Sequence, residues 1–488
     1  MTESWIKKGS SNWRNIFCIG VVQACMGAVV VTTTTTLNRV MVIELSLPAL
    51  IPGFLVSLHY LIQMIRPRMG YGADQTKRFT PWIIGGMAVL ALGGVLAALA
   101  ITWMSEHFVM GAITAFIGFC MIGMGVSACG TTLLALLSKG VGSQQRATSA
   151  TVVWIMMIFG FAVTSVVSGK LLDPFSFDRL LAVSVGVSAI ALLLTSLCML
   201  GLENRLLKNM VDQPSTQNLL DHSNQVFQDT PPHPSQNFKG ALLLLWRDDQ
   251  ARLFTFFVFS SMLAYSAQDL IMEPFAALIY HFTPGQTTQL SGTLHASVLV
   301  GMLILALIGS GWIKGRLGRI STWMSAGCVL SAVGMFGLCL AGLTGAGGPL
   351  LPLNPVLMVL GVGNGLFSIA AISTMMRLAS QSSEMSHLDA KGVKPGIRMG
   401  LWGAAQAVAF GLGGIVGTGA SDLSMRLMGN PSWAYANVFA LEAVMFLVAA
   451  WIAWRVRGLS DKKESPIGLP QTDKESDTSS VRLYLKAI

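Results

Sequence analysis

Long apolar stretches separated by short polar segments recur along the whole chain. Each stretch has about eighteen or more largely apolar residues, enough to cross a hydrocarbon core of about 30 Å as a helix. Inside a bilayer the backbone polar groups must be paired within the segment, so such stretches form helices. The pattern predicts an all-α membrane protein with about twelve spans, at residues 15–37, 48–65, 81–103, 109–137, 146–169, 179–201, 252–280, 288–313, 320–343, 351–377, 398–421 and 433–455.

Composition and charge agree with this interpretation. Of 488 residues, 53% are hydrophobic and only 11% are charged, whereas about a quarter are charged in a soluble protein. With the N-terminus inside, the predicted inner segments contain nearly all of the 32 Lys and Arg, and the outer ones contain only Arg39, Lys170, Arg179 and Arg426. Basic residues favour cytoplasmic loops, so we expect both termini to be cytoplasmic. The net charge of +9 then reflects topology and contact with the lipid bilayer, not nucleic-acid binding.

Two polar segments divide the chain. Residues 203–247 are rich in Gln, Asn, Ser and Pro and lack any period, which predicts a flexible cytoplasmic linker. Residues 458–488 have a similar composition and predict a disordered cytoplasmic tail. The remaining chain forms two six-helix halves, at residues 1–202 and 248–457.

The two halves carry related features, which indicates an internal repeat. Gly123 and Gly125 in the fourth span correspond to Gly363 and Gly365 in the tenth. Short, basic, glycine-bearing loops follow the second and the eighth spans, with Gly70, Asp74 and Arg78 in the first loop and Gly311, Arg316 and Arg319 in the second. These loops resemble the signature of the major facilitator superfamily, in which an acidic residue caps a helix and arginines hold inner carbonyls.

Two carboxylates stand at membrane depth in the seventh span. Asp269 and Glu273 are four residues apart on one helix face, and Pro274 frees a backbone carbonyl beside them. An ionisable group at the bilayer centre costs about 3 kcal/mol, so both are candidates for binding a cation, a proton or a polar ligand group. An interhelical salt bridge or an interfacial turn is the alternative. Arg39 and Glu44, at the end of the first span, are candidate partners, and Arg39 is the expected counter-charge.

Each half also offers one histidine within the membrane, His59 in the second span and His295 in the eighth. A neutral imidazole can bind the magnesium of a chlorin through its free nitrogen. A buried histidine satisfied by a hydroxyl or a carbonyl is the alternative. Gln406 in the eleventh span is a further polar candidate. The seven cysteines lie within spans and lack metal-ligand spacing, so we expect no metal site in the protein.

Several longer runs are more specific than the superfamily loops. They are Leu37 to Leu45, Ser57 to Tyr60, Ile65 to Gly70, Thr80 to Met87, Gln268 to Phe275 and Arg398 to Gln406. Together they resemble the PucC/LhaA family, facilitator-like membrane proteins that assist assembly of bacterial light-harvesting complexes. The resemblance implies a photosynthetic bacterium, a cytoplasmic or intracytoplasmic membrane, bacteriochlorophyll and carotenoid as cofactors, and antenna polypeptides and pigment-synthesis enzymes as partners.

The resemblance therefore favours an assembly factor that binds or delivers bacteriochlorophyll. The alternative is a proton-coupled secondary transporter of a small solute, because a fold does not fix a function. An enzyme such as a membrane prenyltransferase would need paired acidic motifs at the membrane face to hold magnesium diphosphate. The one such spacing, Asp473 and Asp477, lies in the polar tail. We therefore expect no catalytic residues and no enzyme activity.

Overall fold

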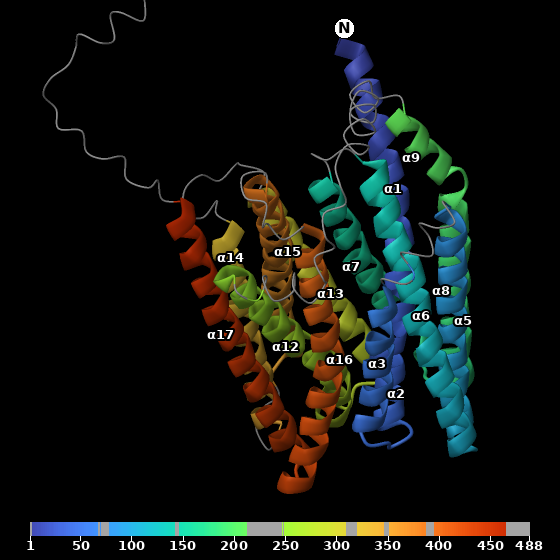
Figure 1. Cartoon of the computed structure of the whole chain (residues 1–488). Coiled ribbons are helices and arrows are strands. Elements are labelled where there is room, and N and C mark those ends of the chain that lie inside the picture. The colour runs from blue at the N-terminus through green and yellow to red at the C-terminus, as the bar shows by residue number, and fades with distance from the viewer. Residues whose placement is uncertain are drawn as a thin grey trace, which may run out of the picture.

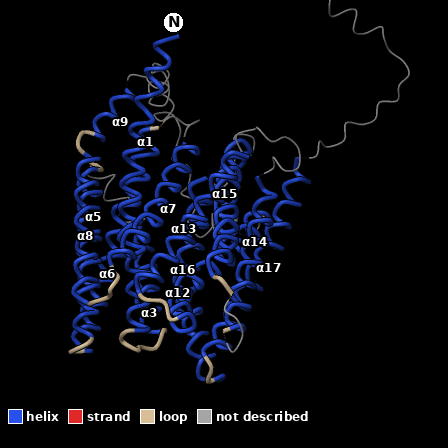
Figure 2. Tube along the Cα trace, turned by 180° about the vertical axis from the view of Figure 1, so that it is seen from behind, coloured by secondary structure: helices blue, strands red, loops and turns tan. Residues whose placement is uncertain are grey.

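The computed structural model describes residues 2–66, 69, 78–141, 146–211, 246, 248–308, 320–345, 351–386 and 395–464. Within these ranges every regular element is a helix, and most helices run side by side along the length of the molecule (Figure 1). We call the end at which the chain begins the N-terminal end, and the opposite end the distal end. Figure 2 shows short loops joining helices at the distal end.

The first group of helices, blue to green in Figure 1, forms one side of the molecule. Its first crossing is continuous over Trp13–Ile43 and changes from α-helix to π-helix and back. The elements are α1 (Thr2–Val31), η1 (Thr32–Leu37), α2 (Asn38–Ile43), α3 (Leu50–Ile62), η2 (Gln63–Ile65), α5 (Thr80–Met104), α6 (Phe108–Gly140), α7 (Arg146–Leu171), α8 (Phe177–Met199) and α9 (Leu202–Val211).

The second group, yellow-green to red, forms the other side (Figure 1). Its elements are α12 (Asp249–Tyr280), α13 (Pro284–Leu307), α14 (Ile320–Thr344), α15 (Leu353–Ser386), α16 (Pro395–Met428) and α17 (Pro431–Glu464). In the described part of the chain, 11 helices are long and apolar enough to cross a membrane, and Leu50–Ile65 is a shorter apolar helix. These coincide with the predicted spans, so the prediction of an all-α membrane protein with two six-helix halves is confirmed.

Two predicted boundaries lie elsewhere in the structure. The linker was predicted to begin at residue 203, but α9 is helical through Val211. Leu202 and Leu206, one turn apart, are buried against the bundle and hold this helix in place. The tail was predicted from residue 458, but α17 continues to Glu464. The rest of the predicted linker and tail lies outside the described residues, apart from Trp246.

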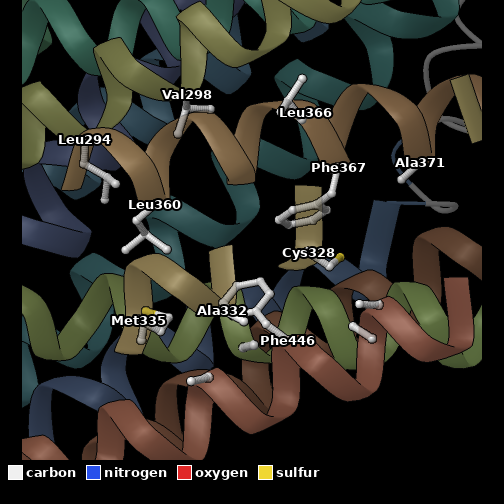
Figure 3. Packing of buried hydrophobic residues seen from close by; sticks show 14 of the residues in the cluster. Leu294, Val298, Cys328, Ala332, Met335, Leu360, Leu366, Phe367, Ala371 and Phe446 are labelled. Carbon is white, nitrogen blue, oxygen red and sulfur yellow. The ribbon is translucent and has the colours of Figure 1, made fainter. Parts of the chain in front are cut away.

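Each half has its own apolar core. One cluster of buried side chains joins α13, α14, α15 and α17, where Phe367 and Phe446 pack with ring centroids 5.9 Å apart (Figure 3). A second cluster joins α1, α3, α5 and α6. Lipid tails are as apolar as these side chains, so close van der Waals packing, not exclusion from water, stabilises the cores in a membrane.

Glycines permit the closest helix approaches. A Cβ added at Gly125 of α6 would lie 2.7 Å from the carbonyl oxygen of Gly86 in α5. A Cβ at Gly365 of α15 would lie 2.8 Å from the backbone nitrogen of Met302 in α13. The related glycines of the fourth and tenth spans therefore serve the same purpose, which is backbone contact between neighbouring helices.

The two halves are bonded to each other at the distal end. The carboxylate of Asp422, near the end of α16, accepts hydrogen bonds from the backbone nitrogens of Ala49 (3.0 Å) and Leu50 (2.8 Å), at the start of α3. A carboxylate is favourable there because the helix N-terminus has a partial positive charge. The hydroxyl of Thr283, which caps α13, donates to Asp173 beyond α7 at 2.8 Å. These bonds join α16 to α3 and α13 to the end of α7.

Candidate functional site

The end of the first crossing is unusually polar for a membrane helix. Residues 32–36 are five consecutive threonines, all buried, and together with Leu37 they form the π-helical turn η1. The hydroxyls of the first four threonines donate to carbonyls of the preceding turn, as Thr35 does to Val31 at 2.7 Å. Thr36 also reaches the other half, where its hydroxyl lies 3.2 Å from that of Thr288 in α13. Single π-turns within helices often mark functional positions. We did not select these threonines from the sequence, although five hydroxyls in a row within an apolar span are a visible signal.

The predicted effect of Pro274 is present in α12. Proline has no N–H, so the carbonyl of Leu270, four residues earlier, loses its helical partner. The side-chain amide of Asn38 in α2 donates to that carbonyl at 2.7 Å. A buried carbonyl left unpaired in a bilayer is costly, so this bond fixes the first crossing against the seventh.

Asp269 and Glu273 lie one turn apart on α12 but in different surroundings. Glu273 is fully buried, accepts a hydrogen bond from the Ser291 hydroxyl of α13 at 2.5 Å, and has Thr35 and Thr287 beside it. Asp269 is only half-buried and has no hydrogen bond or ion pair with any residue that the structure describes. Of the two carboxylates, Glu273 is held within the packing between the halves, and Asp269 keeps part of its surface accessible.

Arg39 pairs with Glu44 and forms no ion pair with either α12 carboxylate within the described chain. Helix α2 ends at Ile43, and the backbone nitrogen of Glu44 still bonds to the carbonyl of Val40, so the helical path places Glu44 little more than one turn beyond Arg39. Arg39 is 3% exposed, and its second guanidinium nitrogen donates to the carbonyl of Phe282 at 3.0 Å. Arg39 thereby links the first crossing to the segment between α12 and α13, and its charge still acts on Glu273.

Both membrane histidines are enclosed by helix packing. The Nδ1 atom of His59 lies 2.5 Å from the Val56 carbonyl, and that of His295 lies 2.8 Å from the Ser291 carbonyl. A carbonyl only accepts, so Nδ1 has the hydrogen in each neutral ring and Nε2 has the lone pair. Neither Nε2 has a hydrogen-bond partner among described atoms. His59 is 0% exposed and His295 is 1% exposed, with the ring of Phe161 edge-on at 5.1 Å.

Three aromatic rings gather beside Asp269. The ring centroid of Phe410 in α16 lies 4.9 Å from that of Tyr60 in α3 and 6.0 Å from that of Tyr265 in α12. Asp269 is close enough to both tyrosines to act on them electrostatically. All four side chains lie deep in the bundle, yet each keeps part of its surface accessible. We call Tyr60, Tyr265, Asp269 and Phe410 the central aromatic site. Gln406, one turn before Phe410, is also half-buried.

Most of the loop motif lies outside the described residues, namely Gly70, Asp74, Gly311, Arg316 and Arg319, whereas Arg78 is described. At the start of α5 a different acid provides a cap. Glu203 of α9 accepts from the backbone nitrogens of Phe79 and Thr80, both at 2.9 Å, and from the Thr80 hydroxyl at 2.5 Å. In the described part of the chain, no group of three or more His, Cys, Asp or Glu residues could hold a metal ion.

Comparison with known proteins gives consistent results. A family model described as PUCC protein matches residues 36–459. A Rhodobacter capsulatus protein named "Bacteriochlorophyll synthase 44.5 kDa chain" is 43% identical over 442 residues, which cover 90% of this chain and 95% of that protein. "Protein PucC" of Rhodobacter capsulatus is 27% identical over 453 residues, covering 88% of this chain and 89% of that one.

A solved structure described as "Structural insights into substrate recognition in proton dependent oligopeptide transporters" superposes with a TM-score of 0.62 and 15% identity. The match covers 92% of this chain and 99% of that one. Such low identity supports a common fold alone, which is that of major facilitator transporters.

Proposed function

This chain belongs to the PucC protein family, and on that premise we propose that it assists assembly of bacterial light-harvesting complexes by binding bacteriochlorophyll or delivering it to antenna polypeptides. The observation that carries the proposal is the 43% identity, over nearly its whole length, to a protein named for bacteriochlorophyll synthesis. Relatives named "Protein PucC" in Rhodobacter capsulatus and Cereibacter sphaeroides support the same proposal.

The central aromatic site supports pigment handling. Aromatic side chains offer flat apolar faces for stacking against another ring system. A carboxylate oxygen beside them is a hard ligand of the kind that magnesium prefers. The site brings together α3 of one half and α12 and α16 of the other, so relative movement of the halves would change its shape.

The position in the cell and the partners are part of the same proposal. The distribution of Lys and Arg along the chain favours a bacterial cytoplasmic or intracytoplasmic membrane with both termini on the cytoplasmic side. We propose antenna polypeptides and pigment-synthesis enzymes as partners, with carotenoid as a second pigment. The relative's name includes the word synthase, and we assign this chain a role beside such an enzyme, with no catalytic step of its own.

A proton-coupled transporter of a small solute is the second candidate. The observation that favours it is the pair Asp269 and Glu273, which lies where the halves meet in a fold shared with a proton dependent transporter. Membrane carboxylates of this kind serve as proton relays in many transporters. The two candidates differ in cargo, so they are separable by experiment.

Deletion of the gene in a native photosynthetic host tests the proposal. We expect the near-infrared absorbance of light-harvesting complexes in isolated membranes to fall at least about tenfold relative to total membrane protein, roughly 1.4 kcal/mol if treated as an assembly equilibrium. Expression of the wild-type chain from a plasmid should restore it. Normal antenna levels in the deletion strain would contradict an assembly role. Proton uptake by proteoliposomes on addition of a solute would then favour the transporter.

A further inference from the structure

We infer that the carboxylate of Asp269 is the axial ligand to the magnesium of a chlorin whose ring lies against Tyr60, Tyr265 and Phe410. This inference rests on the proposed function and gives it a site. It assigns the magnesium to a residue other than His59 and His295, the usual type of ligand for such a metal in a membrane protein.

Helix packing explains why these four side chains meet. Helix α16 lies between α3 and α12 because its glycines face both neighbours. A Cβ at Gly414 would lie 2.7 Å from the Ser57 hydroxyl of α3 and 3.0 Å from the Leu270 side chain of α12. Phe410 is one turn earlier on the same face, so its ring enters the seam between the two helices and contacts both tyrosines.

Asp269 has the accessibility and the unused oxygens that a metal ligand requires. Its neighbour Glu273 is fully enclosed and already bonded to Ser291. Asp269 has neither a hydrogen-bond partner nor a counter-ion among described residues, although it lies deep in the bundle. A charged group removed from water is strongly destabilising unless it is paired, and carboxylates so placed pair with cations or coordinate metals. Magnesium selects oxygen ligands, and a chlorin leaves an axial position of its magnesium open.

The histidines do not have this access. The ring of His59 is 0% exposed and lies against its own neighbour Tyr60, with centroids 3.9 Å apart. His295 is enclosed by Phe161 and the α13 backbone. A flat macrocycle would have to separate packed helices to reach either Nε2 atom. His59 instead contacts the Tyr60 ring and helps to position it.

The two parts of the site predict different contributions to binding. The aromatic rings contact the macrocycle, so their contribution to binding does not depend on whether the metal is present. Asp269 contacts only the metal. A magnesium chlorin should therefore bind more tightly than its metal-free counterpart, and Asp269 should account for the whole difference.

The test uses the full-length protein purified in detergent, titrated with bacteriochlorophyll and with bacteriopheophytin, its metal-free counterpart. Binding is followed by pigment fluorescence. We expect the wild type to bind the magnesium pigment about tenfold or more tightly than the metal-free one. Metal sites typically lose affinity by this factor when a residue that supports a metal ligand is replaced. Asp269→Ala should reduce the affinity for bacteriochlorophyll to that for bacteriopheophytin. Asp269→His, which restores a ligand, should recover the preference.

Further variants separate ligation from general damage. Phe410→Leu should weaken both pigments alike, by about fivefold, because it removes an aromatic contact and no ligand. Asp178→Ala is the control, since it removes an exposed aspartate from the first turn of α8, a helix that contributes no side chain to the site. It should retain the preference, as should His59→Ala and His295→Ala. Resonance Raman spectra of the wild-type complex should show a magnesium with an added axial ligand.

The outcomes are distinguishable. Unchanged magnesium preference in Asp269→Ala, or its loss in His59→Ala or His295→Ala, would overturn the ligand assignment and leave the proposed function standing. If Asp269→Ala does not fold, a wild type that binds both pigments equally would overturn the assignment by itself. Failure of the wild type to bind either pigment would overturn both the assignment and the proposed function.

Discussion

Replacement of Arg39 by alanine is expected to lower the free energy of unfolding by about 3 kcal/mol, the low end of the cost of breaking a buried ion pair. Arg39 is 3% exposed and bonds both the Glu44 carboxylate and the Phe282 carbonyl. Its removal leaves Glu44 unpaired and breaks a link between the halves. The low end applies because the Glu44 side chain is 32% exposed and regains some solvation. Unfolding by SDS titration in mixed micelles measures the change.

Two further variants test the cause. Arg39→Lys retains the charge but not the planar fork that serves two acceptors, so it should lose about half as much. Glu44→Gln should lose less than Arg39→Ala, because it leaves a neutral acceptor for the guanidinium. Equal stability of Arg39→Ala and the wild type would show that this pair does not hold the halves together.

Substitution of Gly365 by leucine is expected to have a similar effect, a loss of about 3 kcal/mol, near the upper end for overpacking. A Cβ there would lie 2.8 Å from the backbone nitrogen of Met302 and 3.0 Å from the Cα of Gly301. These are backbone atoms, so α13 and α15 must move apart. The same SDS titration gives the change in free energy of unfolding.

Gly186 provides the matched control for this prediction. It lies within α8, and no atom is within 4 Å of a Cβ added there. Gly186→Leu should be neutral or stabilising by up to about 1 kcal/mol, because glycine is a poor helix former. Similar losses at both positions would mean that the loss at Gly365 comes from a general intolerance of glycine replacement, not from the contact of α13 with α15.

The architecture was largely predictable from the sequence. Apolar length located the spans, because the bilayer imposes this constraint on each segment separately. The helical period placed Asp269 and Glu273 one turn apart, and the lack of an N–H in Pro274 predicted a free carbonyl. These predictions depend on neighbours in the chain, which a sequence displays directly.

Contacts between distant segments were less predictable. The sequence offered Arg39 as a counter-charge for α12, but it pairs with Glu44, five residues further along at the end of α2. Asn38 as the partner of Leu270, and Phe410 as the ring between two tyrosines, depend on how α2, α12 and α16 are placed in space. Glu203 as a cap for α5 depends on a helix that composition assigned to a linker. Each of these contacts depends on how the helices are arranged in space, which the sequence does not display directly.

Proteins with this fold include transporters, so the fold alone does not distinguish pigment handling from solute transport. The side chains of the site have to make that distinction. Glu273, sealed between the halves, has the surroundings of a structural or proton-binding carboxyl. Asp269, accessible and beside aromatic rings, has the surroundings of a ligand-binding one. We therefore propose different roles for the two carboxylates, although they are only one helical turn apart.

The most direct test of pigment handling is the absorption spectrum of the protein purified in detergent from its native host, with antenna polypeptides quantified in the same sample. We expect near-infrared bacteriochlorophyll bands that co-elute with the protein, together with antenna polypeptides. A colourless protein free of antenna polypeptides would contradict this expectation and favour a transporter of a small solute.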